Sequence, residues 1–160
     1  MAAKHRIVIR ELTPADVNTA CDVQFAAFKD NVMNDLMYPG GINDATKTKS
    51  RERLLAALTS EVDKKKGKAF IYLAEYWPAD SPADAPGEIV AMARWALHAE
   101  PRTEEEYKGE EFNPTAELFG EGANLEFIKV FVGGLNGKTS EHIKGDPYLR
   151  KCSSSPPTCE

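Results

Sequence analysis

Two apolar segments on either side of a proline-containing stretch constrain the fold of this chain more than any other feature. Residues 69–76 (AFIYLAEY) and 88–97 (EIVAMARWAL) are rich in β-branched and aromatic side chains, which favour strands. The residues between them, 77–87, combine Pro, Ala, Asp and Ser without hydrophobic periodicity. A strand, a polar loop and a second strand predict an antiparallel hairpin with a long tip.

Three elements are predicted before the hairpin. Residues 5–12 alternate as a half-buried strand. A helix over 14–29 is expected to begin at Thr13-Pro14-Ala15-Asp16, because threonine caps helices, proline suits the first helical position and aspartate suits the positive end of the helix dipole. A second helix is expected over 45–65. Its basic residues are interleaved with acidic ones, which indicates a solvated face rather than a phosphate site.

The segment between the two helices, 31–43, is unusually apolar for a loop. Pro39, Gly40 and Gly41 interrupt any helix there. Met33, Leu36, Met37 and Tyr38 nevertheless supply large apolar side chains. The segment is therefore expected either to pack over the core or to line a pocket, since loops on rigid scaffolds often carry binding groups.

After the hairpin the composition becomes acidic. Residues 100–122 contain many carboxylates and few aliphatic side chains, so we expect an exposed insertion that serves solvation rather than recruitment of a basic partner. Residues 124–144 show helical spacing of apolar side chains, although three glycines weaken the helix. The predicted order is strand-helix-helix-strand-strand-helix, an α/β (α+β) fold with a mainly antiparallel sheet.

Composition limits the classes of partner. The 160 residues suffice for one domain, and a net charge of −5 argues against nucleic acid. No apolar run reaches the roughly 20 residues that span a bilayer, and the start of the chain lacks a signal-peptide core. We therefore expect no membrane association and a cytoplasmic or nuclear location. The odd cysteine count and the spacing of Cys152 and Cys159 predict neither a disulfide framework nor a metal site.

This order of elements resembles the GNAT superfamily of N-acetyltransferases, and its fungal-type members most closely. The likeness rests on IRELTPAD at residues 9–16 and GEIVAMARW at 87–95, and it extends well over 6–97 and loosely over 124–149. It implies an acyl-CoA N-acyltransferase fold that transfers an acetyl group from acetyl-CoA to a small-molecule or peptide amine.

The resemblance also implies where an acceptor would bind. In that family the loop after the first helix and the end of the third strand line the acceptor site, which here gives Phe28, Met33, Tyr38 and Trp95. Each of these side chains also fits a role in core packing. The polar groups near strand ends are Glu75, Arg94 and His98, and no spacing identifies one of them as the catalytic base.

The family's cofactor motif is absent from these residues. A loop of pattern Gln/Arg-x-x-Gly-x-Gly/Ala normally opens a long helix that holds the CoA pyrophosphate, and the 160 residues contain no match. Residues 133–138 are not a P-loop either, because Val132 stands where glycine is required. We therefore assign no cofactor-binding residue and expect the chain to be inactive alone. Two alternatives remain: a non-catalytic binding module that self-associates through an edge strand, and an unrelated structural α+β domain.

The last residues do not continue the domain pattern. Residues 1–149 are interpreted as a partial N-acetyltransferase domain, with Tyr148-Leu149 where a fourth strand would begin. Residues 150–160 are polar and proline-rich, which disfavours a central strand. Read in a shifted frame, the same codons permit the apolar sequence VLFLAPNLR. The tail is therefore either frame-shifted or naturally disordered, and sequencing the transcript across Leu149 decides between these two explanations.

Overall fold

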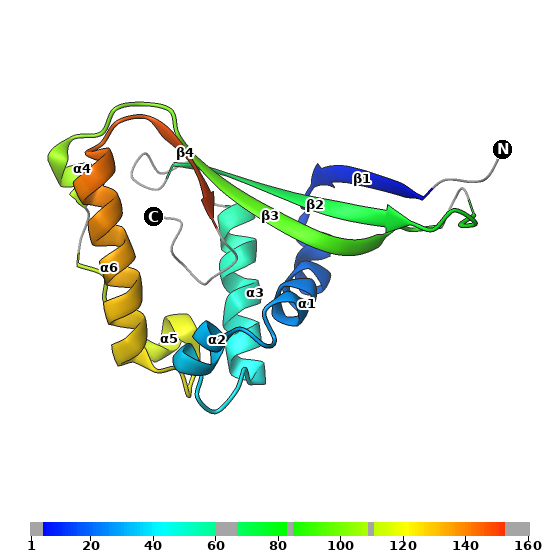
Figure 1. Ribbon diagram of the computed structural model, residues 1–160, viewed down its shortest axis with the longest axis horizontal. Helices are drawn as coiled ribbons and strands as arrows, with labels where there is room; N and C mark the ends of the chain where they lie inside the picture. Colours follow the sequence, from blue (N-terminus) through cyan, green and yellow to red (C-terminus); the bar gives the residue numbers. More distant parts are fainter. Residues whose placement is uncertain (1–4, 60–66, 83–84, 109–110, 153–160) are drawn as a thin grey trace.

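Four strands form one antiparallel sheet, in a computed structural model that describes residues 5–59, 67–82, 85–108 and 111–152. The strands are β1 (Arg6–Glu11), β2 (Lys68–Trp77), β3 (Glu88–His98) and β4 (Tyr148–Cys152), and they lie side by side in chain order (Figure 1). The chain is therefore a mixed α/β protein.

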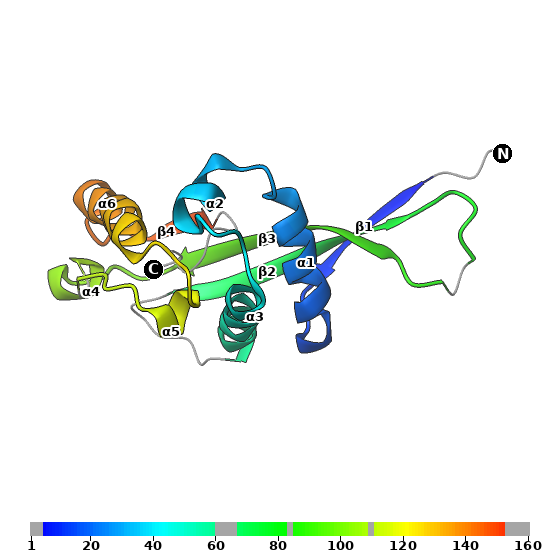
Figure 2. The same ribbon diagram turned by 90° about the horizontal axis from the view of Figure 1, so that it is seen from below.

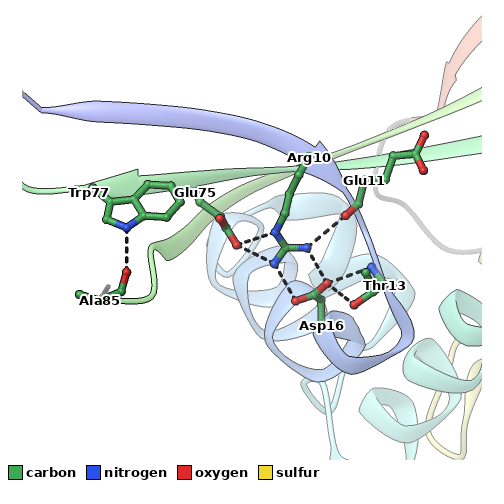
Figure 3. A network of polar contacts seen from close by, with 7 residues as sticks. All are labelled: Arg10, Glu11, Thr13, Asp16, Glu75, Trp77 and Ala85. Carbon is green, nitrogen blue, oxygen red and sulfur yellow. Dashed lines mark hydrogen bonds and ion pairs between the residues drawn. The ribbon is translucent and has the colours of Figure 1, made fainter. Parts of the chain in front are cut away.

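The central hairpin forms as predicted. β2 and β3 pair antiparallel along their whole length, with a bulge at Ala74/Glu75. At the tip of the hairpin the Trp77 indole N–H donates to the carbonyl oxygen of Ala85 at 3.0 Å (Figure 3). A Cβ at Gly87 would lie 2.6 Å from the Trp77 ring, so only glycine allows the ring to rest there. This contact explains the glycine that opens the motif at 87–95.

α1 and α3 lie on one side of the sheet, whereas α4 and α6 stand beyond one end of it (Figure 1). α1 and α3 pack directly under the strands. α2, α5 and α6 surround a second cluster of apolar side chains, separate from the one beneath the strands (Figure 2). The helical segments are η1 (Pro14–Asp16, a 3-10 turn), α1 (Val17–Ala27), α2 (Val32–Met37), α3 (Asp44–Thr59), α4 (Glu104–Lys108), α5 (Ala116–Phe119) and α6 (Leu125–Ile143). The end of the helix expected over 45–65 lies partly outside the described residues.

Two segments differ from the sequence expectation. Residues 31–43 contain α2, which begins where the Asn31 side chain accepts the Met33 backbone N–H at 2.9 Å. The acidic stretch 100–122, expected to be exposed, contains α4 and α5 and contributes Phe119, which is 0% exposed. An aromatic ring surrounded by acidic residues in the sequence gives no periodic signal, although it is buried here by tertiary contacts.

The core has two parts. One lies between α1, α3 and the sheet, and its buried members are Leu12, Val17, Ala20, Cys21, Leu54, Ile71 and Leu73. Cys21 is 1% exposed, and burial raises the pKa of its thiol to about 11, so it acts as a small apolar side chain. The other joins α2, α5 and α6 through Met37, Tyr38, Phe119, Ile128 and Val132.

β1 places large apolar side chains on the face away from the helices. Ile7 and Ile9 are 65% and 64% exposed, whereas Val8 and Arg10 lie on the covered face. We expect Ile9→Thr to change the free energy of unfolding by no more than about 0.5 kcal/mol, because exposed side chains contribute little. Leu73→Ala, in the paired strand and 0% exposed, should cost about 2–5 kcal/mol. If urea unfolding showed that Ile9→Thr and Leu73→Ala lower the free energy of unfolding equally, Ile9 would have to be buried in the folded protein.

β4 begins at Tyr148, where a fourth strand was expected, and continues through Cys152 beside β3. The strand therefore extends past the boundary drawn at Leu149. It occupies an edge of the described sheet, the position in which an irregular sequence is tolerated. The rest of the tail, 153–160, lies outside the described residues. In the described part of the chain, no helix combines the length and apolar character needed to cross a membrane.

Candidate functional site

Tyr38 lies at the C-terminal end of α2, packed into the second core cluster. It is 4% exposed, and burial raises the pKa of its phenol. The positive charge of Arg53 and its hydrogen bonding to the phenol oppose this rise in pKa. A buried hydroxyl usually finds a partner because leaving it unpaired costs about 1–3 kcal/mol.

Arg53 projects from the middle of α3 towards α5. Its guanidinium donates to the Leu118 carbonyl oxygen and to the Ser50 hydroxyl at 3.0 Å, and it lies 5.4 Å from the centre of the Phe119 ring. These contacts fix the orientation of the guanidinium without neutralising it. Burial lowers the pKa of Arg53, and the nearby Tyr38 phenol opposes this effect.

Arg94 lies on the helix-covered face of β3. Strand register places it opposite Ile71, a member of the core cluster that contains Leu54 of α3. Its Nε is buried without a partner. Burial lowers the pKa of Arg94, and the positive charge of Arg53 lowers it further.

Arg53 lies over the Phe119 ring and Tyr38 belongs to the same apolar cluster as that ring, whereas Arg94 lies on the covered face of β3. Neither Arg53 nor Arg94 forms an ion pair with a carboxylate in the described ranges, whereas Arg10 and Arg51 do. Unpaired buried charge is costly, and proteins normally compensate it with an opposite charge. Chemically, the guanidinium groups supply donors only, whereas the phenol hydroxyl both donates and accepts hydrogen bonds.

The structure brings together only some of the predicted acceptor-site residues. Phe28 and Met33 are half-buried at the junction of α1 and α2, where the Asn34 side chain donates to the Phe28 carbonyl oxygen at 2.7 Å. Tyr38 lies at the far end of α2. Trp95 points to the other face of the sheet, because neighbouring strand residues alternate and Arg94 faces the helices.

Glu75 and His98, the other two polar residues noted near strand ends, contact neighbouring side chains of the fold. Glu75 accepts from Arg10 at 2.7 Å, and Arg10 also pairs with Asp16 at 2.7 Å, as Figure 3 shows. His98 is 3% exposed and stacks on Tyr148 with ring centres 4.6 Å apart. Sequence reasoning noted Arg94 without assigning it a role and assigned Arg53 to the solvated face of the helix expected over 45–65. A charged residue at an inward position of an apolar strand was the available signal for Arg94.

The N-termini of α3 and α6 are capped by side chains of the chain itself. A helix N-terminus binds phosphate through free backbone N–H groups. In α3 the Asn43 side chain already accepts the Thr46 N–H at 2.9 Å, and in α6 the Asn124 side chain accepts the Phe127 N–H at 3.1 Å. Among the described residues, no group of three or more His, Cys, Asp or Glu side chains is arranged to hold a metal ion.

Comparisons with known proteins leave the family of the chain unassigned. No protein-family model, curated protein or solved structure significantly matches it.

Proposed function

We propose that the chain is an N-acetyltransferase-type domain, and that its α1–α2 junction and the inner face of β3 form the amine-acceptor side. The observation that supports this proposal is the pairing of β2 with β3 directly after two helices that cover the same sheet. An unrelated α+β domain would have been favoured had these two segments not paired. The acyl-CoA N-acyltransferase fold and its acetyl-CoA chemistry are part of this proposal.

The acceptor side of such a domain must admit an amine in its neutral form and keep water away from it. Phe28 and Met33 offer half-buried apolar contacts at the α1–α2 junction, and the phenol of Tyr38 is the buried polar group at the end of α2. No described residue is assigned as the base. We therefore propose binding and orientation of an amine by these residues, and no chemical step.

The 160-residue chain is expected to show no acetyl transfer and no saturable binding of acetyl-CoA, because its helix N-termini in α3 and α6 are capped by its own side chains. Calorimetry with acetyl-CoA and release of CoA thiol in the presence of amines measure the two properties. Micromolar affinity for acetyl-CoA would contradict this expectation and would show that the cofactor is held by residues we have not assigned.

The acceptor side has its own test. Primary amines, offered as small molecules and as a lysine-containing peptide, are expected to shift the backbone NMR signals of Met33 and Tyr38 in the isotope-labelled chain. The matched alcohols serve as controls. If no amine shifts these signals more than its alcohol does, the acceptor assignment is wrong.

A non-catalytic binding module is a second candidate function, favoured by the exposed isoleucines of β1. An edge strand with unpaired backbone groups is a template for a further strand, and β1 occupies an edge of the described sheet. Light scattering coupled to size exclusion should then show a dimer that dissociates on dilution. A monomer at every concentration would argue against this candidate.

A further inference from the structure

We infer that the side of the sheet opposite α1 and α3, here called the outer face, is a docking surface for a second copy of this chain. Figure 1 shows that no helix of the described ranges lies over this side of the strands. The outer face is separate from the α1–α2 junction and from the inner face of β3, where the amine-acceptor side is proposed. The inference therefore goes beyond the proposed function.

The outer face has an apolar centre and a charged rim. Strand alternation places apolar side chains of β2 and β3 at the centre: Phe70, Tyr72, Ala74, Ala91, Ala93 and Trp95. Ile7, Ile9 and Leu149 flank them in β1 and β4, and these three side chains are 65%, 64% and 58% exposed. The charged side chains that β1, β2 and β3 place on this face lie at strand ends. This distribution is typical of protein–protein interfaces.

The register of β2 and β3 makes the outer face complementary to itself. The aromatic pair Phe70–Trp95 and the alanine pair Ala74–Ala91 lie at equal distances on either side of Tyr72. A two-fold axis that crosses the strands at Tyr72 brings the aromatic pair of one copy over the alanine pair of the other. Large side chains then meet small ones, as interdigitated packing between two sheets requires.

The same rotation also pairs opposite charges. Lys68 begins β2, and its ammonium lies 4.9 Å from the centre of the Phe70 ring on this face. Glu88 is exposed beside Tyr76, at the opposite end of the paired strands. The axis at Tyr72 therefore places Lys68 of each copy next to Glu88 of the other.

The size of the outer face suits a dimer that dissociates on dilution. β2 and β3 are 10 and 11 residues long, and β1 and β4 add 6 and 5. At about 3.3 Å per residue and about 4.8 Å between strands, the four strands present a flat area of about 500 Å². Exposed apolar patches of several hundred Å² mark interaction sites, and weak complexes bury up to about 600 Å² per partner. In the dilute monomer Ile9 stays exposed, so the small effect of Ile9→Thr applies there.

Analytical ultracentrifugation of the whole chain between about 1 μM and about 1 mM tests the dimer. The wild-type chain should pass from monomer to dimer over this range, and a monomer throughout would overturn the proposal. Ala93→Glu should weaken the dimer at least tenfold, because two carboxylates then meet near the axis, and it should keep the wild-type circular dichroism of the monomer. Val130→Glu adds the same charge at a 74% exposed position of α6 and should leave the dimer unchanged.

The same variant separates the outer face from the edge of β1. Ala93 lies in β3, and β2 separates β3 from β1. A dimer formed by strand addition at the β1 edge would therefore survive Ala93→Glu. Survival of the dimer in this variant would overturn the outer-face proposal.

Charge reversal tests how the two copies are oriented. Lys68→Glu and Glu88→Lys change the net charge in opposite directions, yet each should weaken the dimer at least threefold because each brings like charges together. The double variant Lys68→Glu/Glu88→Lys restores both opposite-charge pairs and should dimerise as the wild type does. Opposite effects of the two single variants, or a double variant as weak as either, would overturn the two-fold arrangement about Tyr72. None of these measurements uses an amine or acetyl-CoA, so their outcome is independent of the proposed function.

Discussion

Phe119→Ala is expected to lower the free energy of unfolding by about 3–5 kcal/mol, the usual cost of removing a fully buried aromatic ring. Phe119 is 0% exposed and meets the Phe112 ring edge-on, with the ring centres 6.2 Å apart. It joins α5 to α2 and α6 in the second core cluster. Its loss would leave a cavity in this cluster.

Urea unfolding followed by circular dichroism measures this loss. The neighbouring residue offers a matched control, because Leu118 is 44% exposed in the same short helix and Leu118→Ala should cost about 1 kcal/mol or less. Comparable losses in the two variants would mean that α5 is not packed as described, and the acidic stretch would then be the exposed insertion that its composition suggests.

Arg10→Met is expected to cost about 2–3 kcal/mol at neutral pH, because it leaves two largely buried carboxylates without their shared partner. The Arg10 guanidinium lies between Asp16 and Glu75, whose side chains are only 15% and 12% exposed. Hydrogen bonding to Arg10 lowers the pKa of Asp16 well below its usual range, and the two carboxylates raise the pKa of Arg10.

The pH dependence follows from the lowered pKa of Asp16. A carboxyl group whose pKa is lower in the folded state contributes its full stabilisation above its unfolded pKa of about 3.9. This contribution is lost as the pH falls from there through the folded value. The stability difference between wild type and Arg10→Met should therefore shrink as the pH falls below about 4. Arg51→Met, which removes a more exposed pair, should cost less than about 1 kcal/mol at any of these pH values.

A stability difference that stays constant from pH 7 down to pH 2 would show that Arg10 acts through packing rather than through charge. The stability of each variant is measured by urea unfolding at a series of pH values, with the tail and all other residues unchanged.

Periodic patterns made the main elements of the fold predictable. The hairpin, α1, α3 and α6 each have continuous stretches of strand or helical spacing, so their identity could be read along the chain. α2 and α5 are too short for a period to develop, and they form because Met37 and Phe119 find partners from distant segments. Contacts of this kind join residues that are far apart in the sequence, so no local sequence pattern predicts them.

The candidate site was predictable only in part, for a similar reason. Tyr38 was named because it lies in the loop after the first helix, which lines the acceptor site in the family that the sequence resembles. Arg53 looks like one of several solvated charges of α3 until Leu118 and Phe119 are placed beside it. Trp95 and Arg94 are neighbours in one strand. Strand alternation separates them, but the sequence alone does not say which face the helices will cover.

The network around Arg10 joins residues 65 positions apart, and this separation bears on how the chain folds during synthesis. β1 is made before the other described strands, yet its neighbour in the described sheet is β2. The helices between them can form early from local contacts, whereas strand pairing across such a long loop is slow. β1 must therefore remain unpaired until β2 has been made, and its exposed isoleucines make this nascent stage the one at which a chaperone would be most useful.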